Sequence, residues 1–157
     1  MWIFKSRKQP KQTARPPKIT RWNKTGWESV FSKRVGWENH SVTVDGDYPV
    51  GIGTNELVFR PDDRGNRVVF GKNVRIHSLQ IVFKGSDCSL FIGSDTKLTG
   101  HILIVGKGNT VRIGDRTTAQ GVYILSRGAD VTIGTDCMFS REIEVRSSDV
   151  HKIYDLE

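Results

Sequence analysis

The sequence lacks several features that would place a chain in common classes of protein. It has only two cysteines, Cys88 and Cys137, and they belong to no ligand-like motif, so we expect reduced thiols rather than a disulfide or a metal site. No apolar run is long enough to cross a bilayer. The apolar stretch at residues 1–4 is too short for a signal peptide and is followed, not preceded, by basic residues. These absences predict a cytoplasmic protein.

The chain also has little hydrophobic material for its length. Hydrophobic residues make up 36% of the 157 residues, and 16 residues are glycine. This content is low for a compact α/β enzyme, but it suits a solenoid, whose core is a thin column. The length fits one domain with an appendage.

Positive charge is concentrated at the N-terminus. The formal net charge is +7, and eight positive charges precede the first acidic residue, Glu28, which leaves −1 for the rest of the chain. Three prolines and few core-forming residues accompany this charge, so we predict a basic flexible arm over residues 1–24. A solvated tail is the simplest interpretation, and weak contact with an anionic membrane at the inner face is the alternative. The near-neutral remainder argues against a nucleic-acid-binding body.

A short motif recurs at near-constant spacing from residue 68 onward. Each copy has a large apolar residue, a glycine, two mostly polar residues and a small or β-branched residue. The large residue is Phe70, Ile92, Ile113 or Ile133, so successive copies are 22, 21 and 20 residues apart. Units of this length predict four stacked turns of a parallel β-helix. An antiparallel meander with glycine turns is the alternative, but it does not need one motif at matching offsets.

The motif assigns a role to each position of a turn. The large residue should fill the bore, and the small residue four positions later should point inward at a bend. The glycine suits a corner that needs unusual backbone angles or a close backbone approach. Asn73, Asp95 and Asp136 recur at one corner offset, which predicts a polar stack that Arg116 interrupts. Alternating apolar residues between corners predict the other faces of each turn.

The segment before the repeats reads as an N-terminal cap over residues 25–65. A capping-box pattern at Thr25 and Glu28, with Trp27 and later apolar residues on one helical face, predicts a short helix that ends near Gly36. Packed aromatic residues there should cover the open end of the column. Short strands should follow over residues 41–59, and residues 52–55 resemble a degenerate first copy of the motif.

Residues 92–97 fit a hexapeptide pattern in which an aliphatic residue is followed by a small residue, any two residues, a second small residue and any residue. In this they resemble the left-handed β-helix acyltransferases. Residues 133–140 and 143–155 resemble the O-acetyltransferases of capsule and surface-polysaccharide gene clusters. The resemblance covers residues 66–157 and implies an all-β fold, a single-stranded left-handed parallel β-helix. The handedness comes from the family alone, because the general preference for right-handed crossovers predicts the opposite.

The resemblance also implies a chemistry. The donor would be acetyl-CoA as co-substrate, without a metal, and the acceptor a hydroxyl of a sugar or glycan. The general base falls on His151, and Asp149, or another carboxylate that folding brings near, could orient its imidazole. Such a base contributes about 10²–10⁴-fold to the rate. Transfer should be direct, because no activated Cys or Ser motif is visible, whereas His77 and His101 read as surface or stacked histidines.

The sequence departs from the family at its C-terminal end. Family members continue past residues 153–155 with further turns that build much of the acetyl-CoA groove between subunits of a homotrimer. We therefore expect the β-helix of residues 66–157 to be truncated, as a fragment or naturally, and to have little activity alone. The alternative function is a non-catalytic solenoid scaffold or glycan-binding protein.

Overall fold

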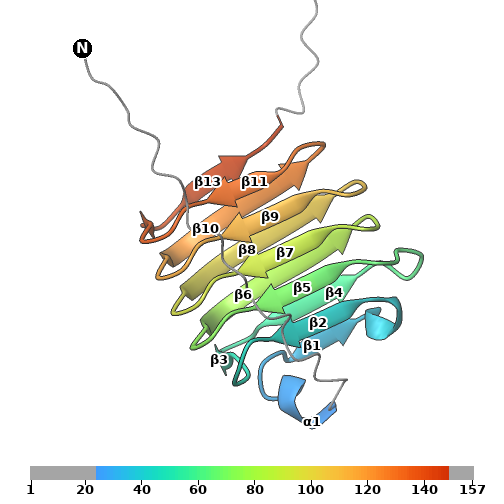
Figure 1. Cartoon of the computed structure of the whole chain (residues 1–157), viewed down its shortest axis with the longest axis horizontal. Coiled ribbons are helices and arrows are strands. Elements are labelled where there is room, and N and C mark those ends of the chain that lie inside the picture. The colour runs from blue at the N-terminus through green and yellow to red at the C-terminus, as the bar shows by residue number, and fades with distance from the viewer. Residues whose placement is uncertain (1–23, 149–157) are drawn as a thin grey trace, which may run out of the picture.

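In the computed structural model, which describes residues 24–148, the chain forms a column of stacked β-coils (Figure 1). Every strand pair is parallel. The first face of the column is a five-stranded sheet. Its strands are β2 (Ser41–Val44), β5 (Arg67–Phe70), β7 (Ser89–Ile92), β9 (Thr110–Ile113) and β11 (Val131–Ile133).

Long strands that bend at a corner supply most of the other two faces. These are β6 (Arg75–Lys84), β8 (Lys97–Val105) and β10 (Thr118–Arg127). Register shifts between Ile76 and Leu79 and between Gln120 and Val122 mark the bend. Shorter strands complete the second face with β3 (Val50–Ile52) and β12 (Met138–Phe139), and the third with β1 (Lys33–Val35), β4 (Glu56–Phe59) and β13 (Ile143–Arg146).

The repeated motif stacks in register, which confirms the predicted parallel β-helix. Phe70 is opposite Ile92, Ile92 opposite Ile113, and Ile113 opposite Ile133. All four side chains are buried. The small residues four positions later also point inward, since Thr96 and Thr117 are almost fully buried. The parallel pairing rules out the antiparallel meander.

The motif glycine is required by the next coil rather than by its own backbone angles. A Cβ at Gly71 would lie 2.6 Å from the backbone nitrogen of Ser94, and one at Gly93 would lie 2.6 Å from that of Asp115. A Cβ at Gly114 would lie 2.5 Å from the carbonyl carbon of Gly134. Of the two reasons that the sequence offered, close backbone approach is therefore the operative one.

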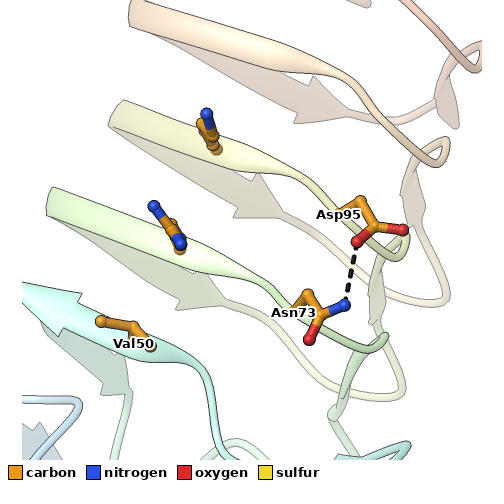
Figure 2. Close-up of a pocket in the computed structure, with 5 residues that line it drawn as sticks. Val50, Asn73 and Asp95 are labelled. Atoms are coloured by element: carbon orange, nitrogen blue, oxygen red, sulfur yellow. Dashed lines mark hydrogen bonds between the residues drawn. The ribbon is translucent and has the colours of Figure 1, made fainter.

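The polar corner stack exists, and Arg116 does not interrupt it. Asn73, Asp95, Arg116 and Asp136 all have left-handed backbone angles, with φ between 54° and 58°. Asn and Asp tolerate this conformation better than other non-glycine residues. The Asn73 amide donates a hydrogen bond of 3.0 Å to the Asp95 carboxylate on the next coil (Figure 2). Arg116 pairs with Asp136 in the same way, so the prediction of an interruption was wrong.

The prediction of a helix that continues to near Gly36 is also wrong, because the helix in the structure is a single turn. The helix α1 spans only Lys24–Trp27, and Lys33–Val35 is the strand β1, which pairs with β4. An uncovered edge of β4 would leave backbone hydrogen-bonding groups unpaired, and pairing with β1 satisfies them. Val35 consequently lies on the outer surface instead of on a buried helical face.

The first coil begins earlier than the sequence indicated. Ile52 is opposite His77 on the second face, so residues 52–55 are not the first copy of the motif. The residue opposite Phe70 is Val44, which makes residues 41–59 a complete coil and gives five coils in the described part of the chain. The predicted aromatic cap is present, because Trp27, Phe31 and Trp37 are buried against one another and against Phe70 or Phe59.

Candidate functional site

The predicted site residues Asp149 and His151 lie outside the described residues, but the structure fixes the point from which they depart. The strand β13 pairs with β10, and Arg146 is opposite Leu125. Ser147 still belongs to the coil, because its N–H donates to the carbonyl of Leu125 at 3.0 Å and its Oγ accepts from the N–H of Arg127 at 2.8 Å. The segment that carries Asp149 and His151 therefore starts at the end of the third face on the uppermost described coil.

An aromatic cluster lies on the outer surface of the third face, on the same coil and the coils that precede it. Gln80, His101, Tyr123 and Glu144 are opposite one another on successive coils. The His101 ring meets the Tyr123 ring edge-on at 5.3 Å. The guanidinium of Arg146 lies 5.3 Å from the centre of the Tyr123 ring and donates to Glu144 at 2.8 Å.

His101 is poorly suited to act as a base. Burial is the main reason that its pKa lies below 6.5, and the nearby charge of Lys84 lowers it further, while Glu56 opposes the shift. Its Nε2 is buried and finds no hydrogen-bond partner among the described residues. An imidazole covered in this way cannot reach a substrate hydroxyl. The prediction of a surface or stacked histidine is met in part, since the His101 ring contacts Tyr123 edge-on instead of stacking on it.

The cysteines give no activated nucleophile. Both are free. Cys88 is fully buried, and its thiol donates to the carbonyls of Ser86 and Gly106 at 3.4 and 3.3 Å. Burial is the largest influence on the Cys88 thiol and raises its pKa, which disfavours the reactive thiolate. Within residues 24–148, no group of His, Cys, Asp and Glu side chains could hold a metal ion.

The second face carries two neighbouring grooves that could receive an anionic ligand. One has a volume of about 350 Å³ and is lined by Val50, Asn73, Arg75, Asp95 and Lys97 (Figure 2). The other, of about 500 Å³, shares Lys97 and continues toward Met138 on the last described coil. Arg75 and Lys97 are opposite each other in register, so the grooves present two cations of the kind that bind phosphates.

Comparisons with known proteins bear on what this column does. No protein-family model matches the chain. It is 33% identical over 105 residues to a polysialic acid O-acetyltransferase of Neisseria meningitidis, across 66% of this chain and 49% of the relative. It is 41% identical over 66 residues to the enzyme of the same name from Escherichia coli O1:K1 / APEC, across 41% of this chain and 21% of the relative.

The fold comparison agrees. The crystal structure of the polySia-specific acetyltransferase NeuO superposes with a TM-score of 0.67 and 32% sequence identity, over 82% of this chain and 57% of that one. These likenesses in sequence and fold are consistent with a hexapeptide-repeat acetyltransferase, the family that the sequence motifs resemble. The chain spans about half the length of the curated relative from Neisseria meningitidis and less of the other. The parallel strands stacked in coils confirm the predicted fold class, an all-β parallel β-helix.

Two features of this column were missed by the sequence analysis. One is the contact of Tyr123 with His101 and Arg146, and the other is an Arg–Phe–Arg cluster on the first face. The alternation of the hexapeptide pattern places Phe91 on the outer surface, directly before the inward Ile92. That signal could have revealed an exposed aromatic residue.

In the described part of the chain, no helix is long and apolar enough to cross a membrane.

Proposed function

We propose that this chain is part of an O-acetyltransferase that moves an acetyl group from acetyl-CoA to a hydroxyl of a sialic-acid-containing polysaccharide. The main support is the shared column of coils together with the names of the relatives, each of which is a polysialic acid acetyltransferase. The grooves of the second face agree with a phosphate-bearing donor, and Arg75 and Lys97 are the residues that would meet its phosphates.

The proposed base is His151, which follows the last described residues of the chain. Its imidazole takes the proton of the sugar hydroxyl as the oxygen attacks the thioester carbonyl. A C–O bond then forms, the C–S bond breaks, and the proton passes to the departing thiolate. Asp149 would hold the imidazole in the required orientation. The absence of an activated cysteine in the described coils is compatible with direct transfer to the sugar.

The full-length enzyme would act as a homotrimer. All of the predicted basic arm except Lys24, which begins α1, lies outside the described residues, so its predicted flexibility and weak contact with an anionic membrane remain proposals. A glycan-binding or scaffolding protein without catalysis is the second candidate function. The exposed arginines of the first face, described below, favour glycan binding independently of catalysis.

The test measures acetyl transfer by the longest protein that contains this chain, beside the 157-residue chain itself. Thiol release from acetyl-CoA and the mass gain of polysialic acid are recorded for wild type, His151→Ala and the exposed-histidine control His77→Ala. We expect His151→Ala to lower kcat/KM by about 10²–10⁴-fold, and His77→Ala to leave it unchanged. The 157-residue chain should show little turnover.

Each part of the proposal can fail separately. Brisk turnover by the 157-residue chain would contradict the expectation that this chain has little activity alone. Equal activity of wild type and His151→Ala would remove His151 as the base. Unaltered glycan binding without any thiol release by the longer protein would favour the non-catalytic alternative.

A further inference from the structure

Two arginines converge on one aromatic ring on the outer surface of the first face. The Arg112 guanidinium carbon lies 4.1 Å from the centre of the Phe91 ring, and that of Arg67 lies 5.5 Å from it. Arg112 is directly opposite Phe91 on the coil above, whereas Arg67 reaches the ring from the coil below. Both arginines are exposed, and Phe91 is half-buried.

These guanidinium groups have no anionic partner within residues 24–148. Neither takes part in an ion pair or a side-chain hydrogen bond there. Stacking on Phe91 holds each group in place by a cation–π interaction and leaves its N–H edge available. The two positive charges near one ring repel each other. An anion that binds there offsets this repulsion and is attracted by both guanidinium groups.

The surroundings suit a sugar better than an apolar partner. Ser89 and Thr110 are partly exposed and occupy the position of Arg67 on the next two coils. The exposed Thr132 occupies the position of Phe91 on the last described coil. A shallow groove of about 670 Å³ runs along this face from Val69 to Thr132. Asp45 and Asp115 line the groove past the glycine corner, and Asp115 already accepts a hydrogen bond from the Ser94 N–H at 2.7 Å.

We propose that Arg67, Phe91 and Arg112 form a docking platform for the carboxylate groups of an acidic polysaccharide. The choice of polysialic acid as the glycan rests on the proposed function. Each guanidinium would bind a sugar carboxylate through paired N–H groups, which is the geometry that arginine offers and lysine does not. The platform lies on the outer surface of the first face.

The experiment measures binding of end-labelled polysialic acid to the 157-residue chain by fluorescence anisotropy, without acetyl-CoA. The test variant is Arg67→Gln/Arg112→Gln, and the matched control is Arg60→Gln, an exposed arginine in the loop before β5. We expect the double variant to bind about tenfold more weakly, because two charge-assisted contacts are lost, and the control to stay within about twofold. Thermal unfolding verifies that the surface variants fold.

A second variant, Arg67→Lys/Arg112→Lys, keeps both charges but removes the planar forks. It should bind about threefold or more weakly than wild type. Neutral dextran should not compete, and vesicles with anionic headgroups should compete poorly. The platform is overturned if the Gln variant binds like Arg60→Gln, if the Lys variant binds like wild type, if dextran competes equally, or if only vesicles bind.

The readouts separate this inference from the proposed function. Glycan binding that depends on Arg67 and Arg112, without acetyl transfer by the longer protein, would refute the proposed function and leave the platform standing. Acetyl transfer with an unchanged KM for the glycan in the Gln variant would refute the platform and leave the function standing.

Discussion

Arg116 and Asp136 form a two-pronged ion pair between adjacent coils. The Arg116 Nε donates to one carboxylate oxygen of Asp136 and a terminal nitrogen to the other, both at 2.7 Å. Both residues occupy the left-handed corner position. The hydrogen bonds from Arg116 lower the pKa of the Asp136 carboxyl, chiefly through direct donation to the charged form.

This pair predicts a pH-dependent contribution to stability. Because the pKa of folded Asp136 lies below its ordinary value of 3.8, the contribution is complete above that pH and is lost as pH falls through the lower folded value. The difference in urea midpoint between wild type and Asp136→Asn should therefore shrink in acid. Asp62→Asn, at an exposed loop position, serves as the control. A gap that widens on acidification would contradict the pairing.

Two motif glycines should respond differently to the same substitution. A Cβ at Gly114 would meet the backbone of Gly134 at 2.5 Å, whereas among the described residues one at Gly134 would meet only the Cys137 sulfur at 3.9 Å. We expect Gly114→Ala to lower the free energy of unfolding by about 1–3 kcal/mol, since the neighbouring backbone must shift. Gly134→Ala should cost less than about 1 kcal/mol. Urea unfolding of the two variants checks this, and equal losses would contradict the close-approach explanation.

These glycines also show what the sequence could predict. The spacing of Phe70, Ile92, Ile113 and Ile133 was sufficient for the parallel register, because each copy repeats the same inward and outward positions. The first coil was misplaced because Val44 precedes Phe70 by 26 residues, and its glycine is displaced by Asp45. The sequence of β1 suggests a helix because the spacing of its apolar residues fits a helix as well as a strand. Only the pairing of β1 with β4 decides between the two.

The candidate site was less accessible to sequence reasoning. Alternation can place Phe91 on the surface, but the approach of Arg67 depends on the side-chain path across a neighbouring coil. The contact of His101 with Tyr123 likewise joins residues that are 22 positions apart. Such contacts depend on the register between neighbouring coils. The motif spacing alone predicts that register only approximately at each bend.

Buried histidine predicts a second pH effect. Burial lowers the pKa of both His101 and His40, so each stays neutral in the folded state until the pH falls below its ordinary 6.5. The stability that neutral His101 supports is present above pH 6.5 and is lost as pH falls through its lower folded value. His101→Gln should reduce this loss in urea titrations, while His77→Gln should not. An identical acid profile for His101→Gln and wild type would contradict the prediction.

The two thiols should label at very different rates. Cys88 is buried with a raised pKa, whereas Cys137 is partly exposed on the last described coil. A short iodoacetamide pulse followed by mass spectrometry should modify Cys137 at least about tenfold faster than Cys88. Urea at the unfolding midpoint should abolish the difference. Fast labelling of Cys88 in native buffer would show that the column opens near that corner.

The loops that lead from the third face back to the first differ in length from coil to coil. They span residues 60–66, 85–88, 106–109 and 128–130, while the strands on either side keep their register. Among the described residues, a Cβ at Gly108 or Gly128 would meet no atom within 4 Å, so the loops have room around these glycines, although their left-handed φ of 74° and 68° means that the glycines themselves should be kept. This margin of the molecule can therefore accept insertions, labels or grafted peptides without changing the spacing of the layers beneath, which makes it the natural place to attach a reporter.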